Sequence, residues 1–156
     1  MAGGRCSPMV DGVGLPGPGE VPAWHAPLSD LTGELTETWA HRHWSWTTGG
    51  CFAFSSAFLA AFGGEEYGLC SQDPEGDFPV EHAVVRLGDA YYDYNGLLDV
   101  EAEMDALARR TGRALTLKPR GEEGVFWFED DFMDDEEMER LHATLAECVP
   151  AGSPKP

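Results

Sequence analysis

The chain contains 156 residues, of which 42% are hydrophobic, so it can bury one substantial core, and a wholly disordered protein is excluded. Its 10 Lys and Arg against 28 Asp and Glu give a net charge of −18, which argues against binding to nucleic acid phosphates or to an anionic membrane. No apolar run approaches the roughly 18 residues of a membrane span, and the N-terminus lacks the pattern of a secretory signal, so we expect a cytoplasmic protein with reduced cysteines.

Composition divides the chain into three parts. Residues 1–22 are rich in Gly and Pro and poor in large apolar side chains, which predicts a disordered arm. Residues 23–149 predict a single domain, and residues 150–156 predict a flexible tail. Between residues 122 and 147, eleven acidic residues stand against one basic residue, Arg140. Such a run is typical of a solvated helix face.

Two helices are expected early in the domain. Leu and Trp side chains recur every four residues over residues 30–43 and predict an amphipathic helix. Three Phe residues repeat at the same spacing over residues 51–62, where the sequence is apolar all round, and this pattern predicts a central helix. Gly63 and Gly64 follow, and glycine readily adopts the left-handed conformation that ends a helix.

A β-hairpin is expected next, after a loop that runs through Cys70 and Asp73. Residues 81–87 alternate with a period of two and predict a strand. Gly88 and Asp89 form the expected two-residue turn, and residues 90–95 predict the return strand, which Gly96 ends.

The rest of the domain predicts two helices and two strands. Asp99 is a suitable N-cap for a helix over residues 100–110, and two strands are expected, one beginning at Leu115 and one over residues 125–128. A last helix is expected over residues 135–148, with Asp134 and Glu137 as its capping box. This order of elements predicts an α+β domain with an antiparallel sheet.

Three candidate catalytic side chains converge in this arrangement. Cys51 begins the central helix, where the helix dipole and free backbone N–H groups favour a thiolate. If the turn has two residues, Leu87 pairs with Ala90, Val84 with Asp93 and His82 with Asn95. Side chains two apart on a strand share a face, so His82, Asp93 and Asn95 project the same way.

These residue types suit nucleophilic catalysis by a thiol. The imidazole of His82 can take the proton of Cys51, and Asp93 or Asn95 can then orient the imidazole ring. The backbone N–H of Cys51 can stabilise an oxyanion, and a second donor is expected from Ser45, Trp46, Thr47 or Thr48.

The motifs around these residues resemble those of the papain-like cysteine hydrolase superfamily. They are Gly-Gly-Cys51-Phe-Ala-Phe, Glu-His82-Ala-Val-Val-Arg-Leu-Gly-Asp and Ala-Tyr-Tyr-Asp93-Tyr-Asn-Gly, and they lie between Gly49 and Gly96. Within it, the resemblance is to small bacterial and phage members, distantly similar to transglutaminase-like and cell-wall amidase-like enzymes. It implies a papain-like fold and a thiol-dependent hydrolase, deamidase or transamidase that acts on a protein or peptide-like substrate. Cys51 would be the nucleophile, His82 the base and Asp93 the orienting residue, with Asn95 as the alternative.

Other interpretations stay open. Cys51 could be a packed core residue, and Asp93 could pair with Arg86 on the same strand face. The chain could then be a non-catalytic acidic module that binds a basic protein partner, or a nucleic acid mimic. We expect no cofactor and no metal, because His41 and His43 lie two apart on a helix and the remaining Cys and His show no zinc-site spacing.

Overall fold

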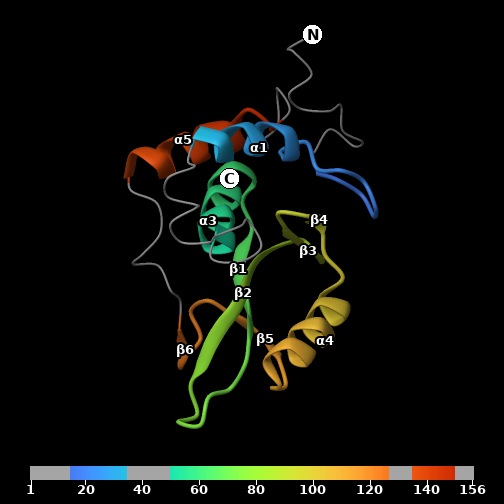
Figure 1. Ribbon diagram of the computed structural model, residues 1–156, viewed down its shortest axis with the longest axis vertical. Helices are drawn as coiled ribbons and strands as arrows, with labels where there is room; N and C mark the ends of the chain where they lie inside the picture. Colours follow the sequence, from blue (N-terminus) through green and yellow to red (C-terminus); the bar gives the residue numbers. More distant parts are fainter. Residues whose placement is uncertain (1–14, 35–49, 127–134, 150–156) are drawn as a thin grey trace.

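A computed structural model describes residues 15–34, 50–126 and 135–149 (Figure 1). Within these ranges the chain forms an α+β fold with four helices and six strands. The elements are α1 (His25–Glu34), α3 (Gly50–Phe62), β1 (Glu65–Cys70), β2 (Phe78–Leu87), β3 (Ala90–Asp93), β4 (Gly96–Leu97), α4 (Val100–Thr111), β5 (Thr116–Pro119), β6 (Val125–Phe126) and α5 (Asp135–Ala146).

The sheet is antiparallel along the order β4-β3-β2-β1-β5, as the sequence predicts. Strand β6 departs from this pattern because it pairs with the first two residues of β2 in parallel. Strand β3 pairs with only the last three residues of β2, from Val85 to Leu87. The middle of β2 therefore has an edge that neither β3 nor β6 occupies.

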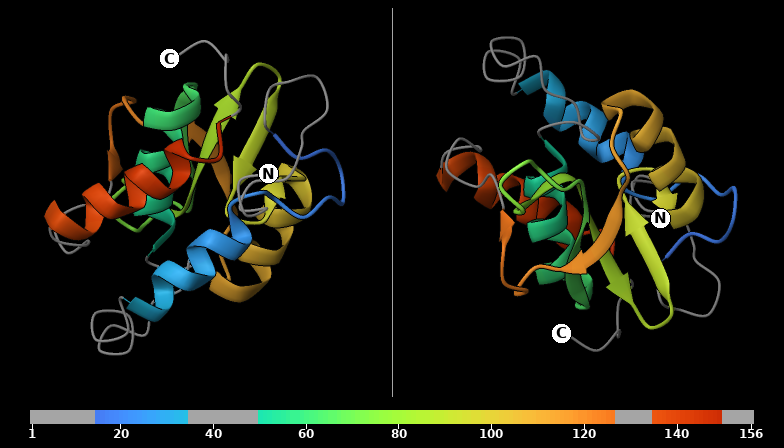
Figure 2. Two further views of the ribbon diagram at one scale, coloured as in Figure 1. Left: turned by 90° about the horizontal axis from the view of Figure 1, so that it is seen from above. Right: turned by 90° about the horizontal axis from the view of Figure 1, so that it is seen from below.

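Helices cover both faces of this sheet (Figures 1 and 2). Helix α3 packs on one face, and α5 and α1 pack over α3 in turn. The core of this side contains Trp24, Leu28, Phe54, Phe58, Val85, Tyr92, Leu141 and Leu145. Helix α4 covers the other face, where Leu107 packs against Leu69 and Val84. Val84 and Val85 thus face opposite cores, as neighbouring residues of a strand do.

Two of the predicted helices are confirmed almost to the residue. Helix α3 ends at Phe62, and Gly63 and Gly64 follow with φ of +84° and +107°. Helix α4 begins at Val100, and the side chain of Asp99 accepts a hydrogen bond from the backbone N–H of Ala102 at 3.1 Å. The bounds of these helices could be predicted because capping residues and glycines close to their ends determine them.

The predicted bounds of other helices need correction. Helix α1 begins at His25, five residues before the expected start, because Trp24 and Leu28 also belong to its buried side. The remainder of the predicted helix over residues 30–43 lies outside the described residues after Glu34. Helix α5 ends at Ala146 rather than at residue 148, and the N-cap expected at Asp134 lies outside the described residues.

Strands show the larger differences. The segment expected as a loop through Cys70 contains β1, the strand that lies between β2 and β5. The predicted return strand ends at Asp93 rather than at Asn95, because the chain turns at once and Gly96 pairs back with Asp93. Of the predicted arm, residues 15–22 are described and pack against the body, where Pro16 and Pro22 are buried.

In the ranges that the structure describes, every helix is too short or too polar to span a lipid bilayer.

Candidate active site

Helix α3 brings Cys51 to the unoccupied edge of β2. Cys51 is the second residue of the helix, and only 1% of its surface is exposed. Its Sγ accepts a hydrogen bond from the backbone N–H of Ala83 at 3.5 Å. This N–H is available to the thiol because β3 pairs with β2 only from Val85 onward. The thiol therefore occupies a place where a neighbouring strand would otherwise bond.

His82 and Asp93 form a buried pair beside this thiol. His82 Nε2 lies 2.8 Å from Asp93 Oδ2, and the two residues are 2% and 3% exposed. Because an ionised carboxylate can only accept, Nε2 carries the hydrogen of this bond. The other carboxylate oxygen, Oδ1, accepts from the backbone N–H of Asn95 at 2.8 Å. Both oxygens of Asp93 are thus fixed, one by the imidazole and one by the chain that follows it.

Cys51 also acts on His82, because a side-chain hydrogen bond and the charge of Cys51 are among the causes that raise the pKa of His82. Since Asp93 engages Nε2, Nδ1 is the nitrogen that remains for the thiol. Burial lowers the pKa of His82, but the hydrogen bonds and negative charges of Asp93 and Cys51 outweigh it and raise this pKa to about 10. The imidazole consequently holds its proton at neutral pH. The imidazole of His82 can therefore hold a proton next to the sulfur of Cys51 and donate it to a group bound beside that sulfur.

The structure brings together three of the four candidate residues. The predicted pairing of Leu87 with Ala90 is confirmed, and this register carries Asp93 to His82. Asn95 lies elsewhere than expected: it is exposed in the turn between β3 and β4, and only its backbone contacts Asp93. Asp93 does not pair with Arg86, whose guanidinium bonds to Gly88 O at 3.0 Å and to Tyr67 Oη at 3.3 Å.

Several groups of this site could not be identified from the sequence. The N–H of Ala83 became available only because β3 stops early, which no residue pattern indicates. Trp24 and His25 both contact the carbonyl of Tyr94, the residue after Asp93. Ser55 lies one helical turn after Cys51, and its Oγ is buried without a hydrogen-bond partner among the described residues. The expected second oxyanion donors at residues 45–48 lie outside the described residues.

Cys70 offers a comparison with Cys51 inside the same apolar cluster. Both side chains are buried among Phe52, Val80 and Ala83. The sulfur of Cys70 bonds only weakly, to Gly68 O at 3.5 Å, and burial raises the pKa of this thiol to about 11. Cys70 thus shows how a buried cysteine of this cluster behaves without an imidazole beside it, although charges on Lys118, Glu122 and Glu81 also act on it. Among the described residues, no three His, Cys, Asp or Glu side chains are grouped closely enough to hold a metal ion.

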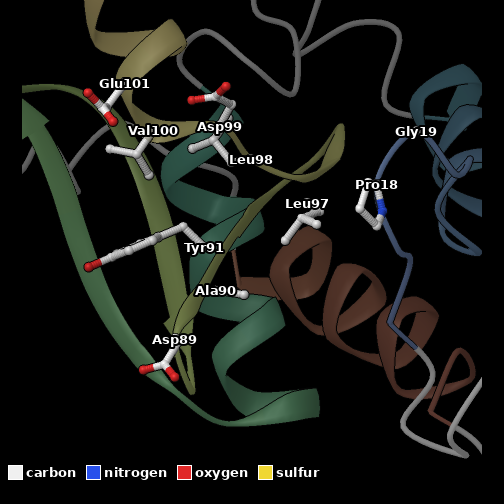
Figure 3. A pocket seen from close by; sticks show the side chains of 10 residues that line it. All are labelled: Pro18, Gly19, Asp89, Ala90, Tyr91, Leu97, Leu98, Asp99, Val100 and Glu101. Atoms are coloured by element: carbon white, nitrogen blue, oxygen red, sulfur yellow. The ribbon is translucent and has the colours of Figure 1, made fainter.

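A separate hollow of about 640 Å³ lies at the other end of β3 (Figure 3). Apolar groups of Tyr91, Leu97 and Val100 line it together with three carboxylates, and no Lys or Arg of the described part of the chain does. The carboxylates are those of Asp89, Asp99 and Glu101. None of the candidate catalytic side chains lines this hollow.

No family model, curated protein or solved structure matches the chain.

Proposed function

We propose that the protein catalyses thiol-dependent acyl transfer on an amide or related carbonyl. Cys51 is the nucleophile, His82 the general base and acid, and Asp93 the residue that orients His82. Two observations carry the proposal: the hydrogen bond between Asp93 and His82, and the effect of Cys51 on the pKa of His82. The three residues come from three different elements. The papain-like resemblance of the sequence names the same residues in the same roles.

The reaction begins from an imidazolium: the raised pKa of His82 keeps the proton of the Cys51–His82 pair on the imidazole, which leaves Cys51 as a thiolate. The thiolate attacks the carbonyl carbon of the substrate, and a bond forms between Sγ and this carbon. The first N–H groups of helix α3 lack intrahelical partners, so the N–H of Cys51 can donate to the developing oxyanion. The tetrahedral intermediate collapses, the bond to the leaving amine breaks, and the imidazolium protonates the amine.

A second nucleophile completes the cycle. His82 is neutral once it has protonated the leaving amine, and it takes a proton from water or from an amine while that nucleophile attacks the thioester. The bond between Sγ and the acyl carbon then breaks, which restores the thiolate and the imidazolium. Water gives hydrolysis or deamidation, whereas an amine gives transamidation. The raised pKa of His82 suits the first half of this cycle, because the imidazolium is the acid that the leaving group requires. The described cysteines are free thiols, which the proposed chemistry and a reducing cytoplasm both require.

Alkylation with iodoacetamide tests the nucleophile against a matched control. Cys51 and Cys70 are equally buried in one cluster, so access differs little between them, whereas only Cys51 contacts an imidazole. At pH 7 we expect Cys51 to be labelled at least tenfold faster than Cys70, as quantified by peptide mass spectrometry. His82→Ala should remove this difference. Equal labelling of the two cysteines in the wild-type protein would refute a reactive thiol.

Turnover is tested with a library of acylated peptides and p-nitroanilide or thioester substrates. Release of the leaving group should stop in Cys51→Ala and fall by about 100-fold or more in His82→Ala, which is the scale of general acid–base catalysis. A covalent thioester adduct of about the acyl mass on Cys51, trapped at low pH, should identify the intermediate.

A non-catalytic role is the second candidate, and two observations favour it. Cys51 is 1% exposed, so a carbonyl group can reach the sulfur only if the residues around it move. The hollow of Figure 3 combines three carboxylates with an apolar floor and suits a segment of a basic protein partner. Under this proposal, the protein binds a peptide that contains Lys and Leu, and the affinity falls as the salt concentration rises. The affinity also falls in the double variant Asp89→Asn, Glu101→Gln, whereas Cys51→Ala leaves it unchanged.

A further inference from the structure

We infer that Trp24 and His25 are positioning residues that fix the orientation of Asp93 toward His82. The inference rests on the proposed function, since it concerns the same three catalytic side chains. It assigns a role in the site to residues at the start of α1, about 70 positions away from Asp93 in the chain.

Two side-chain donors converge on one backbone oxygen next to Asp93. Trp24 Nε1 donates to Tyr94 O at 2.7 Å, and His25 Nε2 lies 2.7 Å from the same oxygen. Because a carbonyl oxygen can only accept, Nε2 of His25 carries a hydrogen in this contact. Two short bonds to one carbonyl restrict rotation of the peptide plane that joins Tyr94 to Asn95.

This peptide plane determines where the carboxylate of Asp93 points. Its other end is the N–H of Asn95, which donates to Asp93 Oδ1 at 2.8 Å. When Trp24 and His25 hold the carbonyl, they therefore also aim the N–H at Oδ1. With Oδ1 fixed, Oδ2 faces Nε2 of His82 at 2.8 Å. The link from α1 to the catalytic pair contains no flexible side chain apart from Asp93 itself.

The donors are held rigidly by their surroundings. Trp24 is fully buried and packs against the rings of Phe54, Phe58 and Phe62 on helix α3. The ring of His25 stacks on that of Tyr94, with centroids 4.3 Å apart and planes at 19°. Helix α3 therefore carries both the nucleophile and the rings that position the Trp24 donor.

The same segment also packs against the far side of the turn. Gly96 has a φ of +104°, and a Cβ at this position would lie 3.0 Å from Pro22 Cγ and 3.3 Å from Pro16 Cγ. Residues 16–25 thus enclose the turn that carries Asp93 from two directions. A bond to Tyr94 O that served only to hold α1 in place would not need this second contact at the same turn.

The test replaces each donor with a side chain of similar shape. Trp24→Phe keeps an aromatic ring in the core and loses the N–H. His25→Leu removes the other donor, whereas His25→Gln retains an amide that can donate to Tyr94 O. Phe62→Leu is the control, because it disturbs the packing of Trp24 without changing any donor to Tyr94. The readout is the titration of the His82 imidazole, followed by NMR of side-chain ¹⁵N in the full chain.

We expect the combination of Trp24→Phe and His25→Leu to lower the pKa of His82 by about one unit, a tenfold change in proton affinity. Trp24→Phe combined with His25→Gln should recover part of this fall, and Phe62→Leu should cause none. Unchanged titration in the folded double variant would overturn the inference. So would an equal fall in Phe62→Leu, because packing rather than the donors would then be responsible. The titration needs no substrate, so an inactive protein that shows these shifts would refute the proposed function and leave the positioning role intact.

Discussion

The substitution Asp93→Asn examines the link on which the candidate site depends. It replaces a carboxylate with an amide of nearly the same shape, so the core around it keeps its volume. The charge next to His82 disappears, while the burial that lowers the pKa of His82 stays. An opposite charge at hydrogen-bond distance typically contributes about 1–3 pKa units. We therefore expect the pKa of His82 to fall from about 10 by about two units.

The same change has a calculable effect on stability. The pKa of His82 is higher in the folded protein than the 6.5 of a free histidine, so its protonation favours folding. This contribution is complete below pH 6.5 and is lost as the pH rises toward 10. A fall of about two units removes about 3 kcal/mol from the free energy of unfolding at pH 6. At pH 10 about half of the imidazole is still protonated in the wild-type protein and almost none in the variant, so the difference should shrink to about 0.4 kcal/mol.

Two measurements decide the matter. NMR of the imidazole nitrogens gives the titration of His82, and urea denaturation at pH 6 and pH 10 gives the free energy of unfolding. Asn95→Ala is the matched control, since the side chain of Asn95 is exposed and only its backbone contacts Asp93. The reasoning fails if the imidazole of the wild-type protein titrates near pH 6.5. It also fails if Asn95→Ala shifts the titration as much as Asp93→Asn does.

Three further substitutions test the structure around the site by urea denaturation. Ser55→Ala should raise the free energy of unfolding by about 1 kcal/mol, because it removes a buried hydroxyl that has no partner; a loss of stability would show that the hydroxyl is bonded. Asp99→Ala should lower it by about 1 kcal/mol through loss of the N-cap of α4, and Asp99→Ser should restore most of this. Gly96→Ala should cost about 1–3 kcal/mol because of its positive φ and the contact with Pro22, whereas Gly76→Ala, with a positive φ but open space around it, should cost less.

The part of the fold that could be predicted depends on short-range signals. Helix α4 has an N-cap residue at one end and a left-handed Gly112 at the other, and both act within one turn of the chain. The hairpin register followed from a two-residue turn, because Gly88 adopts a positive φ of 65° as such turns require. The proximity of His82 and Asp93 could be predicted for the same reason. They lie eleven residues apart in the chain, and the two-residue turn between their strands brings their side chains together.

The structure differs from the sequence-based predictions where contacts between segments far apart in the chain determine the local conformation. Strand β1 (Glu65–Cys70) has no clear alternation, and Gly68 within it would argue against a strand. A side chain at this position would meet Val80 at 2.7 Å, so the close approach of β2 requires glycine there. Similarly, residues 16–25 contact the turn after Asp93, where the return strand stops, and no pattern in residues 90–96 predicts those contacts.

Burial of His82 and Asp93 costs free energy that packing of the core does not require. A buried ionised pair loses solvation that its mutual attraction rarely recovers, and apolar side chains of equal volume are often as stable or more so. Cys70 shows that a buried thiol in this cluster needs no imidazole beside it. A chain that required only a core could fill the places of His82 and Asp93 with Leu and Val. Here they form a buried pair near Cys51 at the start of α3, and the residues before α1 contact the turn that carries Asp93. Such a pair is what the proposed proton transfer to and from Cys51 requires.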